Sequence, residues 1–98
     1  MVLTILEAAV ESHPVADLEA AFRGADADVP AGLIRSLLVS AGGSPARCRI
    51  ETLWTSRDAL AAMRQAGTPA GVLMFRAAGA EPSLTVCHVI ATIEAPPA

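Results

Sequence analysis

The sequence contains no lysine, asparagine or tyrosine, and aromatic residues make up only 3% of its 98 residues. Its seven basic residues are all arginines scattered along the chain, and its net charge is −3, so a nucleic-acid-binding surface is not predicted. No apolar run approaches the roughly 18 residues of a membrane span, and the N-terminal segment lacks the basic residues of a signal peptide. We therefore expect a cytoplasmic protein with neither a nucleic-acid nor a membrane partner.

Residues that could hold a metal or another cofactor are also few. Cys48 and Cys87 lack the spacing of a metal site and lie in separate strand-like runs, which predicts reduced thiols rather than a disulfide. The two histidines, His13 and His88, are far apart in the sequence, and His13 suits a helix cap before Pro14. There is no glycine-rich phosphate loop and no serine elbow. We therefore expect no cofactor.

Apolar residues, in contrast, make up 53% of the chain and fall into short runs separated by glycine and proline. The length predicts one domain, residues 1–98, with a frayed tail at 94–98. The patterns predict strands and helices in the order strand, helix, strand, strand, helix, short helix, strand. The strands are expected at 2–10, 33–39, 48–54 and 84–93, and the helices from Pro14 onward, at 58–66 and at 70–78. This order is typical of an α+β, ferredoxin-like split βαβ sandwich, with an antiparallel sheet and its helices on one face.

The strands are apolar on both faces, which a sheet with helices on one side does not require. In the first strand, Val2 and Leu6 share one face, while Leu3 and Ile5 share the other. Because the helices can cover only one face, the other needs a cover that this chain does not supply. We therefore expect a homodimer in which two copies pack sheet against sheet.

Four segments of the chain resemble the antibiotic biosynthesis monooxygenase family, and together they span nearly its whole length. The segments are VLTILEAAV, PAGLIRSLLVS, LWTSRDALAAMR and MFRAAGAEPSLTVCHVI. The resemblance implies a homodimer that closes a dimeric α/β barrel, with a pocket between sheet and helices in each subunit. It also implies oxidation of small aromatic, polyketide-like or quinol-like substrates by dioxygen without metal or flavin. Related members degrade haem.

Only part of the family's functional set has a counterpart here. Trp54 matches the tryptophan at the end of the third strand, which lines the family's pocket. Haem degraders also use an asparagine in the first strand and a histidine before the last strand. This chain has no asparagine, and Ala78 and Gly79 stand where the histidine is expected. The tyrosine and asparagine of the polyketide oxidisers are missing too, so neither catalytic set can be assembled.

The candidate catalytic residues are therefore Trp54 and His88. Trp54 offers a flat face and an N–H donor, and His88 is a base near neutral pH. Each also has a purely structural interpretation, Trp54 as a core residue and His88 as a strand residue. We expect Trp54 to face the helix-side pocket with Thr52 and Ile50, because the three share a strand parity. The candidate substrate-binding residues are Thr52, Phe22, Met63, Met74, Phe75 and Arg76.

Three functions remain open at this point. One is a cofactor-independent monooxygenase acting on a small aromatic substrate. The second is a domain that binds a small apolar ligand without converting it, and the third is a dimeric interaction domain whose pocket is filled. A cavity of several hundred Å³ beside Trp54 would favour the first two over the third.

Overall fold

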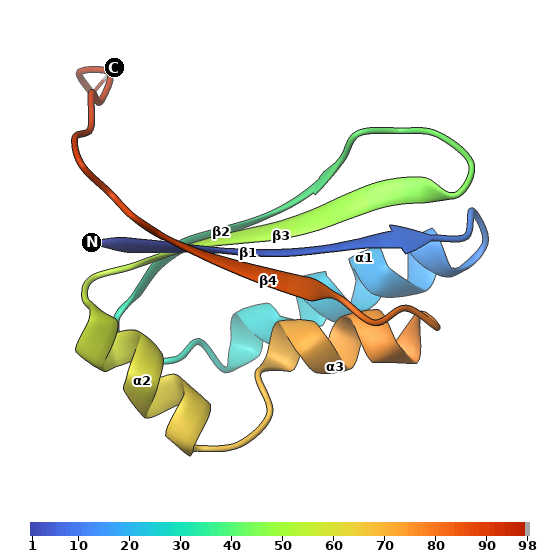
Figure 1. Ribbon diagram of the computed structural model, residues 1–98, viewed down its shortest axis with the longest axis horizontal. Coiled ribbons are helices and arrows are strands. Elements are labelled where there is room, and N and C mark those ends of the chain that lie inside the picture. The colour runs from blue at the N-terminus through green and yellow to red at the C-terminus, as the bar shows by residue number, and fades with distance from the viewer. Residues whose placement is uncertain (98) are drawn as a thin grey trace.

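The computed structural model describes residues 1–97 and has a four-stranded antiparallel sheet with helices on one face (Figure 1). Its elements are β1 (Val2–Val10), α1 (Pro14–Gly24), the 3₁₀ helix η1 (Ala25–Ala27), β2 (Leu33–Ser40), β3 (Ala46–Trp54), α2 (Arg57–Gln65), α3 (Ala70–Ala77) and β4 (Ser83–His88). The strands are ordered β2-β3-β1-β4. This order confirms the predicted α+β, ferredoxin-like fold.

The two main helices begin in different ways. Helix α1 has a proline in its first turn, and His13 occupies its N-cap position, both as expected, but the side chain of His13 makes no capping hydrogen bond. In α2, the Ser56 hydroxyl accepts a hydrogen bond from the Ala59 backbone N–H at 3.1 Å. This bond caps the start of α2, which follows directly after the strand that ends at Trp54.

Strand β4 is shorter than its apolar sequence predicted, because it ends at His88 rather than at residue 93. The reason is the length of its neighbour: His88 pairs with Val2, the first residue of β1, so the following residues have no strand to pair with. Figure 1 shows the chain leaving the sheet here, on the side opposite the helices. Ile90 and Ile93 are 97% and 101% exposed. The predicted frayed tail extends to residue 98, which lies outside the described residues.

The core lies between the sheet and the helices and has two apolar clusters. The larger joins Leu18 of α1 and Phe75 of α3 to β1 and β3, and the smaller joins Trp54 to Val2 and to Leu60 of α2. The inward-facing residues of β3 are all buried, and they are Ala46, Cys48, Ile50, Thr52 and Trp54. The predicted parity is therefore confirmed, with Trp54 on the helix side of the sheet.

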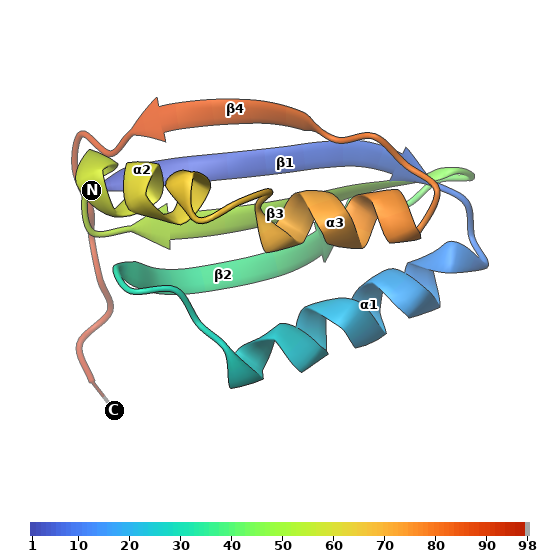
Figure 2. The ribbon, with the colours of Figure 1, turned by 90° about the horizontal axis from the view of Figure 1, so that it is seen from below.

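The other face of the sheet has no cover among residues 1–97 (Figure 1). Figure 2, seen from the helix side, shows α2 and α3 in front of the sheet. Leu3, Ile5 and Leu53 are half-buried there, because they have sheet neighbours but no layer above them. Cys87 lies on this open face and Cys48 on the helix face, since they pair with β1 residues of opposite parity. Both cysteines are free, as predicted.

Candidate functional site

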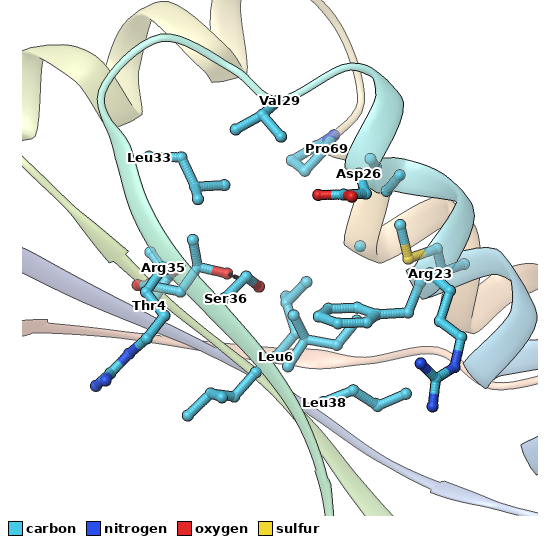
Figure 3. Close-up of a pocket in the computed structure, with 18 of the residues that line it drawn as sticks. Thr4, Leu6, Arg23, Asp26, Val29, Leu33, Arg35, Ser36, Leu38 and Pro69 are labelled. Carbon is cyan, nitrogen blue, oxygen red and sulfur yellow. Dashed lines mark hydrogen bonds between the residues drawn. The ribbon is translucent and has the colours of Figure 1, made fainter.

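The main cavity has a volume of about 1060 Å³ and lies between α1, η1 and the helix face of the sheet (Figure 3). Its walls are largely aliphatic, aromatic and thioether side chains, with Trp54 at one end. The side chains that define it include Leu6, Val15, Leu18, Phe22, Val29, Leu33, Leu38, Ile50, Trp54, Met63, Pro69 and Met74. A space of this size and lining can hold a fused-ring ligand.

The structure brings five of the eight predicted site residues to this cavity, namely Trp54, Thr52, Phe22, Met63 and Met74. Phe75 lies elsewhere: it is fully buried in the larger core cluster, on the face of α3 that packs against the other helix and the sheet. Phe75 therefore fills the core and does not line the cavity.

Arg76 lies beside a second, smaller cavity of about 180 Å³ rather than beside the main one. Its guanidinium donates two hydrogen bonds to the Glu81 carboxylate, both of 2.9 Å. These bonds raise the pKa of Arg76 above its ordinary value and lower that of Glu81. Arg76 therefore has a partner within the chain and links the end of α3 to the segment that leads into β4.

His88 lines neither cavity and is exposed at the end of β4. It does share the helix face with Trp54, because Val2 pairs with Trp54 on one side and with His88 on the other. Two strand spacings separate Trp54 from His88, which is about 10 Å. The two candidate catalytic residues thus lie in one cross-strand row but not in one cavity.

Trp54 is both a core residue and a residue that lines the main cavity. It is only 4% exposed and packs in the smaller core cluster, yet it also lines the main cavity. Its indole N–H donates to the hydroxyl of Thr4 at 3.0 Å. The N–H is therefore engaged within the protein, and what Trp54 offers a ligand is its apolar surface.

Three hydroxyl groups cross the cavity floor in the next row of the sheet. Thr4 pairs with Thr52, and Thr52 pairs with Ser36, so all three project from the same face. The hydroxyls of Ser36 and Thr52 are 2.9 Å apart, and Thr4 donates to the Thr52 carbonyl at 3.4 Å. The sequence analysis identified Thr52 alone. The signal for the other two was a hydroxyl residue at an inward position of an otherwise apolar strand.

Charged groups lie at the edge of the cavity. Arg23 is paired with Glu19 at 2.9 Å, and Asp26 and Asp28 lie on or next to η1. In Figure 3 the Asp26 carboxylate points toward the interior, whereas the guanidinium of Arg35 extends away on the far side of β2. Among residues 1–97 no three histidine, cysteine or acidic side chains come together in a way that could hold a metal ion. Within the same range, no helix has the length and apolar character needed to cross a membrane.

No family model matches the sequence, and no curated protein matches it either. Solved structures do match its fold. SnoaB, a cofactor-independent oxygenase from Streptomyces nogalater, is 20% identical, with a TM-score of 0.65 over 94% of this chain and 95% of its own. The haem degrader MhuD from Mycobacterium tuberculosis is 22% identical, with a TM-score of 0.65 over 96% and 100%.

A third structure, of an antibiotic biosynthesis monooxygenase, is 10% identical, with a TM-score of 0.67 over 93% of this chain and 100% of its own. At these identities the similarity establishes the fold and leaves the chemistry open. The chain therefore has the ferredoxin-like fold of solved structures of the antibiotic biosynthesis monooxygenase family, as its sequence motifs indicated.

Proposed function

We propose that the protein is a cofactor-independent monooxygenase that oxidises a small aromatic substrate bound in the main cavity. The observation that carries this proposal is the cavity of about 1060 Å³, bounded by apolar side chains and by Trp54. Ligand pockets for small molecules commonly measure 300–1,000 Å³ and are mostly apolar. The sequence motifs and the fold shared with SnoaB supply the proposed reaction class.

Such a reaction balances without an added reductant. A phenol and dioxygen give a quinone and water: one oxygen atom enters the ring, and the other leaves as water with electrons that the substrate supplies. The protein then has to hold the ring, exclude bulk water and favour loss of the substrate proton. The apolar walls of the cavity suit the first task.

Removal of the substrate proton requires a base. A base must come within hydrogen-bonding distance of the proton that it accepts. His88 can do so only for a substrate that extends from Trp54 across Val2 to the end of β4, because it does not line the cavity. Because His88 does not line the cavity, this geometry supports a second candidate function, a domain that binds an aromatic ligand without converting it. A filled interaction domain fits poorly with a cavity of this size.

We also propose that the protein works as a homodimer. The open sheet face carries Leu3, Ile5 and Leu53 without any cover from the described part of the chain. The segment after β4 leaves the domain on the same side and exposes Ile90 and Ile93 almost completely. A second copy packed on this face would bury both features, and a stable interface needs more than about 1,000 Å².

The test is oxygen consumption by the purified protein with fused phenols and quinols, without added metal or flavin, alongside calorimetric binding of the same compounds. Met74→Trp places a large side chain in the cavity, and we expect it to reduce both turnover and affinity at least tenfold. The matched control is Leu73→Trp, because the neighbouring Leu73 is 53% exposed on the same helix and lies outside both cavities. Binding without oxygen consumption would identify the protein as a ligand-binding domain. If no compound binds, neither function holds.

A further inference from the structure

In the middle of the cavity floor, the polar groups lie in one row of the sheet, between the two apolar clusters of the core. Leu6, Ile50 and Leu38 form the row on one side, and Val2, Trp54 and Leu33 form the row on the other. Between them lie the hydroxyls of Thr4, Thr52 and Ser36. A ligand that lies along the cavity floor must therefore pass over these hydroxyls.

One hydroxyl hydrogen in this row has no hydrogen-bond acceptor within the row. The Thr4 hydroxyl accepts from Trp54 and donates to the Thr52 carbonyl, so its hydrogen is engaged. Ser36 and Thr52 share a single bond in which either oxygen can be the donor. Two hydroxyls with one bond between them retain one hydrogen, and the part of the chain that the structure describes offers it no further acceptor. That hydrogen is available to a group in the cavity.

The charges around the cavity indicate what kind of acceptor would be suitable. Within residues 1–97 two arginines line the cavity, and one of them, Arg23, is already paired with Glu19. Arg35 extends away from the cavity, whereas the Asp26 carboxylate points into it (Figure 3). An anionic ligand would lose hydration, find no unpaired cation that points into the cavity from residues 1–97 and meet a like charge. A neutral oxygen avoids all three penalties.

We propose that Ser36 and Thr52 form the orienting subsite of the cavity and that they bind a neutral phenol or ketone oxygen on an otherwise apolar ring. This deepens the proposed function, because it rests on the cavity accepting an aromatic ligand. Thr4 and Trp54 are positioning residues in this subsite: the indole N–H holds the Thr4 hydroxyl, and Thr4 in turn binds the Thr52 backbone. The subsite determines orientation and selectivity whether or not the ligand is oxidised.

Three matched probes separate the cavity from the subsite: naphthalene, 2-naphthol and 2-naphthoate, measured by calorimetry or equilibrium dialysis at neutral pH. The first has the ring alone, the second adds a neutral hydroxyl, and the third adds a negative charge. We expect 2-naphthol to bind about five- to tenfold more tightly than naphthalene, as one neutral hydrogen bond predicts. We expect 2-naphthoate to bind more weakly than either.

The variant for this test is the double substitution Ser36→Ala/Thr52→Val, which removes both hydroxyls and nearly preserves shape. It should abolish the preference for 2-naphthol and leave naphthalene binding unchanged, which also shows that the variant has folded. The control is Ser83→Ala/Thr85→Val, because these residues lie on β4, face the open side of the sheet and line neither cavity. The control should keep the preference.

The outcomes distinguish the two proposals. If the wild-type protein binds naphthalene and 2-naphthol equally, or if the double variant keeps the preference, the subsite is overturned while the cavity remains a binding site. If 2-naphthoate binds most tightly, the inference that the ligand is neutral is wrong. If none of the three probes binds, both the proposed function and the subsite fall.

Discussion

A hydrogen bond that no local sequence pattern reveals holds the side chain of Trp54 in place. Its indole donates to Thr4, a residue 50 positions away, and both side chains are buried. A buried acceptor that loses its donor carries a free-energy penalty of about 1–3 kcal/mol. The bond therefore connects the end of β3 to β1 and sets the position of the cavity wall.

Trp54→Phe should consequently affect stability more than ligand selectivity. We expect the free energy of unfolding to fall by about 2 kcal/mol, from the lost hydrogen bond and the smaller ring. The preference for a neutral ring oxygen should decrease only in part, because Thr4 loses its donor while Ser36 and Thr52 keep their hydroxyls. Urea unfolding measures the first quantity and probe binding the second. In a Thr4→Val background the same substitution should cost less, because the bond is already absent. Equal costs in the two backgrounds would show that the bond contributes nothing.

The ion pair of Arg76 and Glu81 predicts a pH dependence at the same scale. The pKa of Glu81 is lowered by its hydrogen bonds with Arg76, so the folded state gains stability above the ordinary glutamate pKa. That gain disappears as the pH falls through the lowered value. Glu81→Gln should therefore lower the Tm slightly at neutral pH and leave it unchanged in strong acid. Because the pair is exposed, high salt should also reduce the difference. A difference that persists in acid would contradict this origin.

At the scale of elements, the approach of β2 to α2 depends on one glycine. Gly32 has a φ of +84°, a conformation that residues with a side chain rarely adopt. A Cβ there would lie 2.4 Å from the Ala59 Cβ and 3.0 Å from the Thr55 hydroxyl. The Gly32 carbonyl also accepts from the Thr55 N–H at 2.8 Å. This contact sets the start of α2 beside Trp54.

Gly32→Ala should lower the free energy of unfolding by about 2–4 kcal/mol, from backbone strain together with the steric clash. Gly24→Ala is its matched control. Gly24 has helical backbone angles, with φ −65° and ψ −24°, and open space around it. That substitution should stabilise the protein by about 0.5–1 kcal/mol. Chemical denaturation of the two variants tests both the predicted loss and the predicted gain in the free energy of unfolding. A small loss for Gly32→Ala would mean that α2 shifts easily.

At the scale of the whole molecule, the open face of the sheet combines apolar and charged regions. Glu7 pairs with Arg47 at 3.0 Å and with Arg49 at 3.9 Å, and Arg49 also pairs with Glu51 at 3.4 Å. These charges largely neutralise one another, which lowers the cost of covering them. Leu3, Ile5 and Leu53 supply the apolar part. The face is therefore suited to packing against another protein surface.

Leu37→Arg tests the proposed dimer on this face. Leu37 lies opposite Glu51 in the register of β2 and β3 and is 44% exposed. An arginine at this position would place a new charge in the interface. We expect sedimentation at micromolar concentration to show a shift from dimer toward monomer. Leu73→Arg is the control, because Leu73 is 53% exposed on α3 and lies away from the sheet. A wild-type protein that sediments as a stable monomer of about 10 kDa would rule out the dimer.

Local signals in the sequence account for most of the fold. Turn residues and apolar runs are local signals, and they predicted the element order and the side of the sheet that Trp54 faces. They failed at the end of β4, where Val89, Ile90 and Ile93 have strand-like character. A strand requires a partner as well as suitable residues, and the partner β1 begins at Val2.

Which of the predicted residues meet depends on long-range packing. Met63, Met74 and Phe22 reach one cavity, whereas Phe75, the neighbour of Met74 in sequence, is completely buried in the core. Helical periodicity identifies a face but does not show whether that face is filled or hollow, because the answer depends on how far α1 stands from the sheet. The row of Thr4, Thr52 and Ser36 likewise exists only because three strands align in register, which is a long-range property of the chain.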